Sequence, residues 1–273
     1  MITFPNAKIN LGLNIVNRRP DGYHDIETVF YPIPLTDALE IVPSAEGETS
    51  LTCYGRKVDC PAEKNLVMKA YSLLKENCDV PPVEIHLYKH IPDGAGLGGG
   101  SSDASATLTM LNEMFRLGIS REELEVMAST LGADCAFFIN NSPVMATGIG
   151  NVFSPVDVDL KGKFLFLVKP DVSVPTKAAY AQVSPSPSLQ SIPDILKRPI
   201  AEWKQFLKND FEPSVFNQYP LLGDMKKVIE EAGAMYCAMS GSGSSLYGIF
   251  DSANMAEDLE RQFLQYDHYV MCL

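Results

Sequence analysis

Residues 92–102 read PDGAGLGGGSS, and five of these eleven positions are glycine. Because glycine has no Cβ, such a backbone can close tightly on a ligand and offer it several N–H groups. Residues 83–91 alternate polar and apolar side chains, which predicts a strand, and residues 103–116 are rich in Ala, Leu and Met, which predicts a helix. A glycine-rich turn that leads into a helix N-terminus suits a di- or triphosphate. The residues assigned to this nucleotide-binding loop are Pro92, Asp93, Gly94, Ala95, Gly96, Leu97, Gly98, Gly99, Gly100, Ser101 and Ser102.

Two other nucleotide-binding patterns fit this loop less well. Gly94, Gly96 and Gly99 match G-x-G-x-x-G, the fingerprint of nicotinamide-dependent oxidoreductases. That fingerprint requires an acidic residue at a strand end about 20 positions later, whereas the candidate, Glu113, falls inside a predicted helix. The pattern G-x-x-x-x-G-K-[ST] fails because no lysine follows the glycines. The context therefore favours a different phosphate-binding loop.

The composition indicates a globular protein that does not bind nucleic acid. Of 273 residues, 46% are hydrophobic and 21% are charged, which is ordinary for a folded chain. The formal net charge is -12, so the chain would repel a polyphosphate backbone. A small anionic ligand remains compatible with this charge, because local lysines and backbone N–H groups can bind it.

Cysteine spacing and the N-terminal sequence predict a cytoplasmic location. The six cysteines show no C-x-x-C spacing and are expected to be reduced thiols in a reducing compartment. The opening residues 1–16 are interrupted by polar side chains, so they do not resemble a signal peptide. No stretch approaches the roughly 20 apolar residues of a membrane helix. The cysteines are Cys53, Cys60, Cys78, Cys135, Cys237 and Cys272.

The order of the predicted elements indicates an α+β fold with an antiparallel sheet. We place a domain boundary near residue 152, which gives domains 1–152 and 153–273. Prolines between residues 184 and 200 predict an exposed loop without a core element. Strands are predicted at 8–16, 26–33, 38–42, 83–91, 162–169, 234–239, 246–250 and 268–272. Helices are predicted at 64–77, 103–116, 121–131, 176–182, 221–232 and 253–265.

Several segments together resemble the GHMP kinases. PDGAGLGGGSSDASA at 92–106 is similar to the second motif of this superfamily, which includes homoserine and mevalonate kinases. AKINLGLNIVNRRPDGYHDIETVF at 7–30 resembles most closely the branch that phosphorylates a cytidine diphosphate derivative of methylerythritol in isoprenoid biosynthesis. The resemblance implies an N-terminal ATP-binding domain like ribosomal protein S5 domain 2 and a ferredoxin-like C-terminal domain. It also implies that ATP and substrate bind between these domains.

The resemblance assigns the chemistry to Asp134 and Lys8. Asp134, in the segment LGADCAFF, would be the catalytic base that accepts or orients the proton of the attacking hydroxyl. Lys8 would keep that carboxylate ionised and offset charge on the phosphoryl group in transfer. Taken alone, an aspartate before an apolar run is often a helix N-cap, and Lys8 would be a surface lysine.

The resemblance also assigns five residues to the substrate. Tyr23 would stack on the cytosine and His24 would hydrogen-bond to its edge, with Tyr180 stacking on the other side. Thr176, four residues before Tyr180 on a predicted helix, would lie near the diphosphate or the erythritol end. Asn10 faces the same side of its strand as Lys8 and would contact substrate. The serine loop, residues 240–245 (SGSGSS), would shape the substrate side or form a tight turn.

The remaining expectations concern adenine, metal and partners. Asn65 resembles the adenine-contacting position of the family. The sequence offers no firm carboxylate ligand for Mg²⁺, so Ser102 or water would complete its coordination, and Asp103 would act indirectly or favour the helix start. A homodimer through an exposed C-terminal strand edge is one option. Another GHMP kinase and a non-catalytic nucleotide-binding module remain as alternatives.

Overall fold

The computed structural model describes residues 1–58, 60–188 and 190–273, and it divides into two compact units. Each unit is assembled from separated segments of the chain. Unit 1 comprises Met1–Lys8, Leu35–Asp93 and Gly98–Ser142, and unit 2 comprises Ile9–Pro34, Gly94–Leu97 and Pro143–Leu273. The domain boundary near residue 152 stays a prediction. None of the helices among the described residues is both long and apolar enough to cross a membrane.

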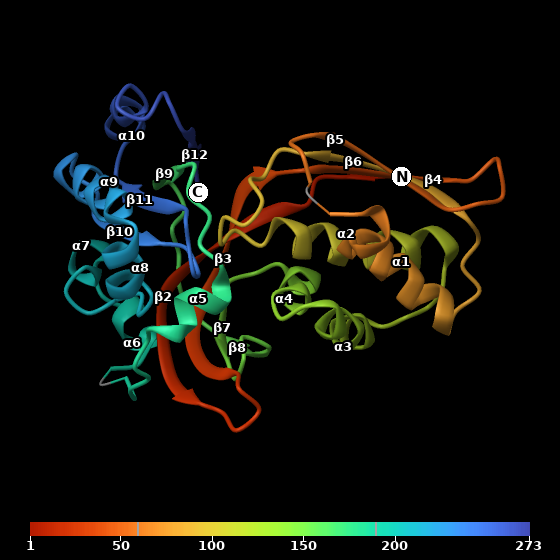
Figure 1. The fold of residues 1–273 in the computed structure, drawn as a ribbon, viewed down its shortest axis with the longest axis horizontal. Coiled ribbons are helices and arrows are strands. Elements are labelled where there is room, and N and C mark those ends of the chain that lie inside the picture. Colours follow the sequence, from red (N-terminus) through yellow and green to blue (C-terminus); the bar gives the residue numbers. More distant parts are fainter. Residues whose placement is uncertain (59, 189) are drawn as a thin grey trace. The chain divides into compact units, whose positions relative to one another are not determined.

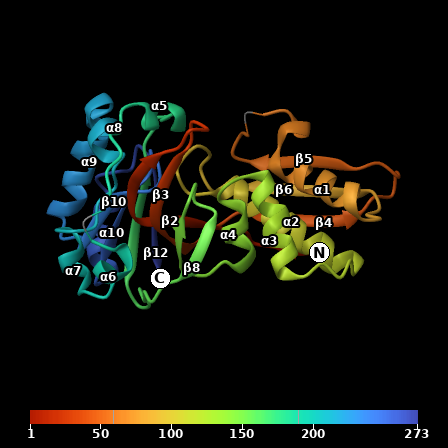
Figure 2. The same cartoon turned by 90° about the horizontal axis from the view of Figure 1, so that it is seen from below.

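Unit 1 is a four-stranded sheet of order β1-β4-β6-β5 with helices on one face (Figure 1). Figure 2 shows α1, α2 and α3 grouped together against the sheet. All neighbouring strands are antiparallel except β5 and β6. The elements are β1 (Ile2–Thr3), β4 (Ala38–Pro43), β5 (Ser50–Gly55), the short 3-10 helix η1 (Ala62–Lys64), α1 (Leu66–Asn77), β6 (Val83–Lys89), α2 (Gly99–Phe115), α3 (Arg121–Leu131) and α4 (Cys135–Asn140).

Local sequence explains where the helices of unit 1 begin. The side chain of Asn65 accepts a hydrogen bond from the Val67 N–H and caps α1. A complete capping box between Ser120 and Glu123 starts α3. Gly98, which has a positive φ of 73°, turns the chain immediately before α2. Of these three helix starts, that of α2 directly follows the nucleotide-binding loop.

Unit 2 contains two four-stranded sheets, and one of them is ferredoxin-like. Strands β9, β10, β11 and β12 pair antiparallel in the order β10-β11-β9-β12, with α9 and α10 packed against them (Figure 1). This order matches the split β-α-β arrangement expected of the C-terminal half. The elements are β9 (Phe164–Lys169), α8 (Glu212–Gln218), α9 (Pro220–Glu231), β10 (Tyr236–Met239), β11 (Leu246–Phe250), α10 (Ala253–Glu260) and β12 (Asp267–Cys272).

The second sheet of unit 2 has the order β2-β3-β7-β8. Leu13, Ile15 and Ile26 from its first two strands join a hydrophobic core with Phe166 and Val168 of β9. Burial of these apolar side chains removes them from water and stabilises the unit. The elements are β2 (Asn6–Arg18, whose first three residues belong to unit 1), β3 (His24–Thr36), β7 (Val144–Thr147), β8 (Val152–Pro155), α5 (Thr176–Ala181), α6 (Ile192–Leu196) and α7 (Ile200–Trp203).

The α+β fold class is confirmed, and three local predictions were wrong or incomplete. Helix α2 begins at Gly99 instead of residue 103, because the chain turns at Gly98 and the last residues of the predicted loop form the first helical turn. The segment 184–200 is not entirely an exposed loop: α6 buries Ile192 and Ile195, which are three residues apart on one helical face. Leu189 lies outside the described residues. Helices α4, α7 and α8 and strands β1 and β5 were not assigned from the sequence.

Candidate active site

The two residues predicted to carry the chemistry lie side by side in unit 1. The Nζ atom of Lys8 on β2 is 3.5 Å from Oδ2 of Asp134, directly before α4. The Lys8 side chain is 4% exposed, whereas that of Asp134 is 32% exposed. A buried cation thus faces a carboxylate that solvent or a substrate can still reach. Burial of Lys8 also excludes the alternative that it is an ordinary surface lysine.

Asp134 occupies the N-cap position of α4 without capping it. Its φ and ψ are -81° and -14°, and its side chain makes no capping hydrogen bond to the helix. The next residue, Cys135, is completely buried and anchors this turn. Burial raises the pKa of the Cys135 thiol to about 11, and the neighbouring Asp134 carboxylate adds to the effect. The turn therefore presents a carboxylate beside Lys8, while the adjacent thiol stays protonated and unreactive.

The end of the nucleotide-binding loop that lies in unit 1 passes closely over the side chain of Lys8. A Cβ at Gly98 would lie 2.9 Å from the Phe138 ring and 3.3 Å from Cγ of Lys8. Only glycine fits this approach and this positive φ. By contrast, a Cβ at Gly100 would meet nothing closer than Leu66 at 3.9 Å. The backbone is therefore pressed against Lys8 on one side and open on the other, where helix α2 begins with N–H groups free of intrahelical partners.

The tip of the same loop, Gly94–Leu97, belongs to unit 2 and rests on the serine loop. The Ser240 hydroxyl donates to the Gly96 carbonyl at 2.8 Å, and the Ser245 N–H donates to the Ala95 carbonyl at 3.3 Å. A Cβ at Gly96 would lie 2.0 Å from the Ser240 carbonyl oxygen. The serine loop, assigned from the sequence to the substrate side or to a simple turn, thus holds the tip of the nucleotide-binding loop.

A buried charge cluster joins the two stems of the nucleotide-binding loop within unit 1. Lys89, at the end of β6, donates to the carboxylate of Asp37 and, at 2.7 Å, to Oδ2 of Asp103 on α2. The other oxygen of Asp37 accepts from the backbone N–H groups of His90 (2.6 Å) and Ile91 (2.8 Å). The strand before the loop and the helix after it are therefore tied to one ammonium group. We call Asp37, Lys89 and Asp103 the stem cluster.

The stem cluster shifts the pKa values of its members. Burial alone would lower the pKa of Lys89, but the charges of Asp103 and Asp37 outweigh burial and raise it. Burial raises the pKa of Asp103 to about 7, and the negative charge of Asp37 adds to this against the opposing effect of Lys89. Oδ1 of Asp103 has no hydrogen-bond partner. Asp103 therefore gains a proton within the physiological pH range.

Asn65, assigned to adenine, and Ser102, assigned to the metal, are both part of the helical framework of unit 1. Oδ1 of Asn65 caps α1 at 3.0 Å, which leaves the amide nitrogen as its donor for a ligand. Ser102 is buried in α2. In the part of the chain that the structure describes, no group of three or more His, Cys, Asp or Glu side chains is arranged to hold a metal ion.

Two of the predicted substrate residues, His24 and Tyr180, lie against one another in unit 2. The rings of His24 and Tyr180 stack with centroids 4.7 Å apart and an interplanar angle of 17°. Tyr180 in turn packs edge-on against Phe211, at 4.8 Å and 84°. Burial, followed by the charge of Arg18, lowers the pKa of His24, so its imidazole is neutral near pH 7. The structure brings His24 against Tyr180, whereas Tyr23 is 63% exposed at the hairpin between β2 and β3.

Asn10 and Thr176 are each held by a hydroxyl group. The amide nitrogen of Asn10 donates to Thr28 Oγ1 at 3.0 Å, and that hydroxyl donates to the Gly12 carbonyl at 2.5 Å. The Tyr247 hydroxyl donates to the backbone carbonyl of Asn10 at 2.6 Å. Thr176, the first residue of α5, lies 3.2 Å from the Ser242 hydroxyl in the serine loop. These bonds orient Asn10 and link α5 to the serine loop.

Sequence reasoning missed the stem cluster, although one signal was present. In β6, Val83, Ile85 and Leu87 point inward, and Lys89 continues the same alternation. A lysine at such a position requires a buried anionic partner. The identity of Asp37 as that partner could not be read from local sequence, because 52 residues separate it from Lys89.

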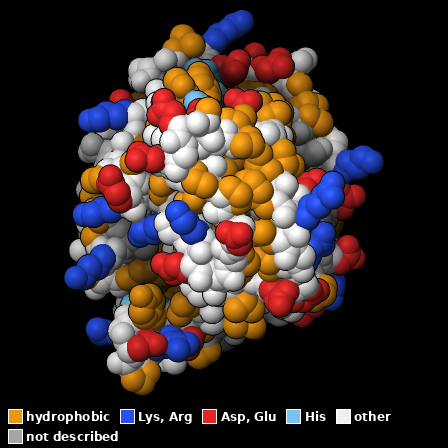
Figure 3. Space-filling view, turned by 90° about the vertical axis from the view of Figure 1, so that its right-hand side faces the viewer, with side chains coloured by type: hydrophobic (Ala, Val, Ile, Leu, Met, Phe, Trp, Pro, Cys, Tyr) orange, Lys and Arg blue, Asp and Glu red, His pale blue; other side chains and the backbone are white. Residues whose placement is uncertain are grey.

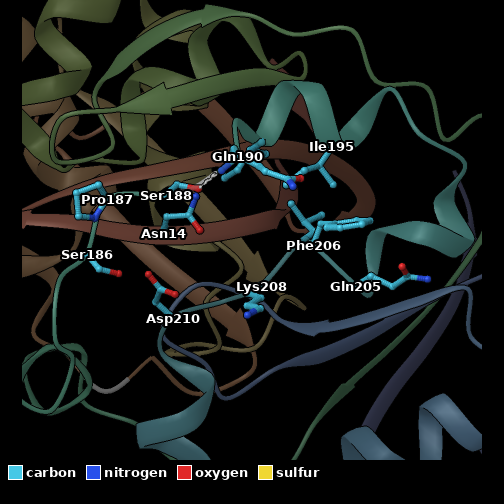
Figure 4. Close-up of a pocket in the computed structure, with 12 residues that line it drawn as sticks. Asn14, Ser186, Pro187, Ser188, Gln190, Ile195, Gln205, Phe206, Lys208 and Asp210 are labelled. Carbon is cyan, nitrogen blue, oxygen red and sulfur yellow. Dashed lines mark hydrogen bonds between the residues drawn. The ribbon is translucent and has the colours of Figure 1, made fainter.

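Two surface features do not coincide with the predicted residues. A pocket of about 270 Å³ in unit 2, lined by residues that include Asn14, Lys208 and Asp210, contains none of the assigned catalytic or binding residues (Figure 4). On the face shown in Figure 3, acidic and basic side chains are interspersed among apolar ones. Among the described residues on this face, Lys and Arg do not gather into the extended patch typical of nucleic-acid binding.

Comparison with known proteins identifies the family. The model for the GHMP kinases N terminal domain matches residues 65–142, and the model for the GHMP kinases C terminal domain matches residues 191–267. Together these matches span more than half of the chain, which therefore belongs to the GHMP kinases. The resemblance inferred from residues 7–30 and 92–106 is confirmed.

Individual relatives show which members of the family the chain is similar to. The 4-diphosphocytidyl-2-C-methyl-D-erythritol kinase of Bacteroides thetaiotaomicron is 56% identical over 253 residues, which cover 92% of each chain. A crystal structure of 4-(cytidine 5'-diphospho)-2C-methyl-D-erythritol kinase matches with a TM-score of 0.85 and 31% identity, over 99% of this chain and 98% of the other. The mevalonate kinase of Methanococcus jannaschii has a TM-score of 0.73 at 13% identity, over 99% and 96% of the two chains, and shares the fold alone.

Proposed function

We propose that this protein transfers the γ-phosphoryl group of ATP to the 2-hydroxyl of 4-diphosphocytidyl-2-C-methyl-D-erythritol, with ADP and the 2-phosphate as products. The observation that carries this proposal is the 56% identity, over 92% of both chains, to a relative named as the kinase of that substrate. GHMP kinases use ATP as the phosphate donor. The weaker similarity to mevalonate kinase, 13% identity, gives no comparable support for another alcohol.

Asp134 and Lys8 would carry out the proton transfer and the charge stabilisation. The 2-hydroxyl oxygen forms the new bond to the γ-phosphorus as the bond between that phosphorus and the β,γ-bridging oxygen breaks. Asp134 accepts or orients the hydroxyl proton, and the electron pair of the broken bond leaves with ADP. Lys8, whose Nζ lies 3.5 Å from the Asp134 carboxylate, would offset negative charge on the group in transfer.

The nucleotide-binding loop and the start of α2 would bind the ATP phosphates through backbone N–H groups. The open side at Gly100 and the N-terminal dipole of a 17-residue helix support this assignment. Mg²⁺, when bound with ATP, would neutralise phosphate charge. Asn65 would use its amide nitrogen toward adenine, since its oxygen caps α1.

The aromatic residues of unit 2 would recognise the cytosine. A neutral His24 has both a donor and an acceptor nitrogen, which suits the edge of a pyrimidine. Tyr180, half-buried and held by Phe211, provides a ring face for stacking, and the exposed Tyr23 can close on the opposite face. Asn10 would contact the substrate, and Thr176 would lie near its diphosphate or its erythritol end.

The cellular setting and the assembly state are part of the proposal. The six cysteines are all free, and three of them are exposed, which supports a reducing cytoplasm. The small-molecule substrate is the expected partner. A homodimer through β12, an edge strand of its sheet, stays a prediction that size-exclusion chromatography with light scattering can test.

A coupled ADP-release assay with Mg·ATP tests the function. The cytidine diphosphate methylerythritol compound is compared with homoserine and mevalonate at equal concentrations. We expect turnover on the cytidine compound alone. Turnover on another alcohol with silence on the cytidine compound would keep the family and overturn the substrate. ATP binding without turnover of any of the three alcohols would contradict the kinase proposal and favour a binding module.

A further inference from the structure

We propose that the segment Asn209–Glu212 (NDFE) is a positioning hub of the site in unit 2, with separate effects on phosphate-side and base-side binding. The segment follows α7 and ends at Glu212, the first residue of α8, and none of its residues was assigned a role in the reaction. Its four consecutive residues contact the serine loop, β2 and α5. The names of the ligands rest on the proposed function, whereas the contacts do not depend on it.

Asn209 and Glu212 hold the entry to the serine loop. The buried Asn209 amide nitrogen donates to the carbonyls of Met239 (2.7 Å) and Gly241 (2.9 Å), and its oxygen accepts from the Phe211 N–H. Glu212 accepts from the Met239 N–H at 2.8 Å and pairs with Lys226 at 2.6 Å. Both polar groups of the Met239 backbone are thus bound by this segment. A two-donor amide is the only neutral side chain of this size that can satisfy both carbonyls.

The serine loop passes this constraint to the nucleotide-binding loop. Ser240, the residue after Met239, donates its hydroxyl to the Gly96 carbonyl at 2.8 Å. The backbones of Gly96 and Ser240 are in direct contact, because even a Cβ at Gly96 would collide with Ser240. Displacement of the serine loop would therefore move Gly96. Asn209 thus acts on the phosphate-binding backbone indirectly, first through the serine loop and then through the tip of the nucleotide-binding loop. It is therefore a positioning residue.

Phe211 acts on the base side through a different contact. Its ring, 2% exposed, packs edge-on against Tyr180 at 4.8 Å, and Tyr180 carries the stacked His24. Edge-to-face aromatic pairs fix the orientation of a ring as well as its depth. Asp210, between Asn209 and Phe211 in the sequence, binds the segment to β2. Its carboxylate accepts a hydrogen bond from the Ile15 N–H at 2.7 Å, and its side chain lines the pocket in Figure 4. This pairing sets the register of the whole segment.

The test compares Asn209→Asp and Phe211→Leu with Leu259→Ala as the control. Asn209→Asp keeps the shape but loses both donors and sets a carboxylate against two carbonyls. Phe211→Leu keeps an apolar side chain but loses the ring edge. Leu259 lies on α10 in the same hydrophobic core as Phe211, and its truncation should destabilise the unit while it removes none of the hydrogen bonds or ring contacts of the segment. Each full-length variant is compared with the wild type by hydrogen exchange and by steady-state kinetics.

The first readout, hydrogen–deuterium exchange followed by mass spectrometry, needs no substrate. We expect Asn209→Asp to speed exchange at least about 10-fold in residues 239–245 with little change in 176–181, since the loss of one buried interaction corresponds to about that factor. Phe211→Leu should show the reverse pattern. Leu259→Ala should affect the two peptides equally or neither. If all three variants give the same pattern, the hub proposal is wrong, whatever the enzyme phosphorylates.

The second readout is the division of effects between Michaelis constants. Phe211→Leu should raise KM for the cytidine substrate about 5- to 10-fold, in line with the loss of one aromatic pair, with KM for ATP changed less than about 2-fold. Asn209→Asp should raise KM for ATP or lower kcat by about 10-fold or more and leave KM for the cytidine substrate nearly unchanged. Failure of the wild type to use the cytidine compound would count against the proposed function, and the exchange pattern would still decide on the hub.

Discussion

The stem cluster predicts a pH-dependent stability that one substitution should remove. Asp103 is buried, and its pKa is raised from its usual 3.8 to about 7, first by burial and then by the charge of Asp37. Because the folded-state pKa lies above the unfolded value, the folded protein binds this proton more tightly. The resulting contribution to the free energy of unfolding is complete below about pH 4 and is lost as the pH rises to about 7. Asp103→Asn, which cannot titrate, should abolish it.

The expected magnitude follows from the pKa difference. At about 1.36 kcal/mol per pH unit, the difference corresponds to about 4 kcal/mol in total, of which about 3 kcal/mol falls between about pH 4.5 and pH 7.5. Lys89 does not disturb this window, because its own pKa is raised and its contribution is lost only under alkaline conditions. The measured quantity is the wild-type free energy of unfolding minus that of the variant, as a function of pH.

Urea unfolding followed by far-ultraviolet circular dichroism provides the assay, at about four pH values across that window. Subtraction of the variant curve removes the titration of all other carboxylates. Asp251→Asn serves as the control, because the Asp251 side chain is 70% exposed and pairs with Lys163 at the surface. The control should run parallel to the wild type. If the Asp103→Asn curve also runs parallel, within about 0.5 kcal/mol, then Asp103 does not titrate as the structure implies.

Three further predictions concern the proposed catalytic pair, Asp134 and Lys8, and the nucleotide-binding loop. Asp134→Asn should lower kcat by at least about 10²-fold while ATP affinity, measured by calorimetry, stays the same, and equal turnover would remove Asp134 from the chemistry. Lys8→Met should also lower kcat, by about 10-fold or more, and a change in KM alone would make Lys8 a binding residue. Gly96→Ala should cost about 1–3 kcal/mol in thermal unfolding and weaken ATP binding, because its Cβ would collide with Ser240. Gly94→Ala, which also has a positive φ but meets no atom within 4 Å, should cost less, and equal losses would rule out the collision.

The features that the sequence predicted best are those with a local signal. The alternation in residues 83–91 and the glycines that follow identified a strand and a turn, and both are present as β6 and the nucleotide-binding loop. Periodicity placed the C-terminal elements nearly as observed, so the ferredoxin-like order followed once strand pairing was known. The pairing itself is non-local, and only the family resemblance supplied it.

Helix α6 was not predicted because two local signals in its sequence conflicted. Prolines in 184–200 indicated a loop, yet Ile192, Ile195 and Leu196 have helical spacing, and burial of that apolar face prevailed in α6. Pro193 does not oppose this helix, because it lies in the first turn, where a missing N–H costs nothing. The spacing of three apolar residues was a better guide than the density of prolines.

Part of the site could not be predicted because the partners are distant in sequence. Asn209 reads as a polar turn residue, and its bonds go to carbonyls about 30 positions further along the chain. The pair Lys8–Asp134 was found only because a family pattern links two segments that have no local relation. Polar residues that hold a backbone in place carry no periodic signal, since their partners are main-chain atoms of any residue type.

The buried Cys135 beside Asp134 has a practical consequence for chemical probes. An electrophilic fragment reacts with thiolate, and this thiol is both inaccessible and held protonated, with a pKa of about 11. Covalent labelling beside the Asp134 carboxylate should therefore fail on the folded protein, whereas Cys53, Cys60 and Cys272 are exposed and open to maleimide dyes. Labelling of Cys135 would thus report opening of the turn at Asp134, a readout of local unfolding at the proposed catalytic residue that requires no substrate.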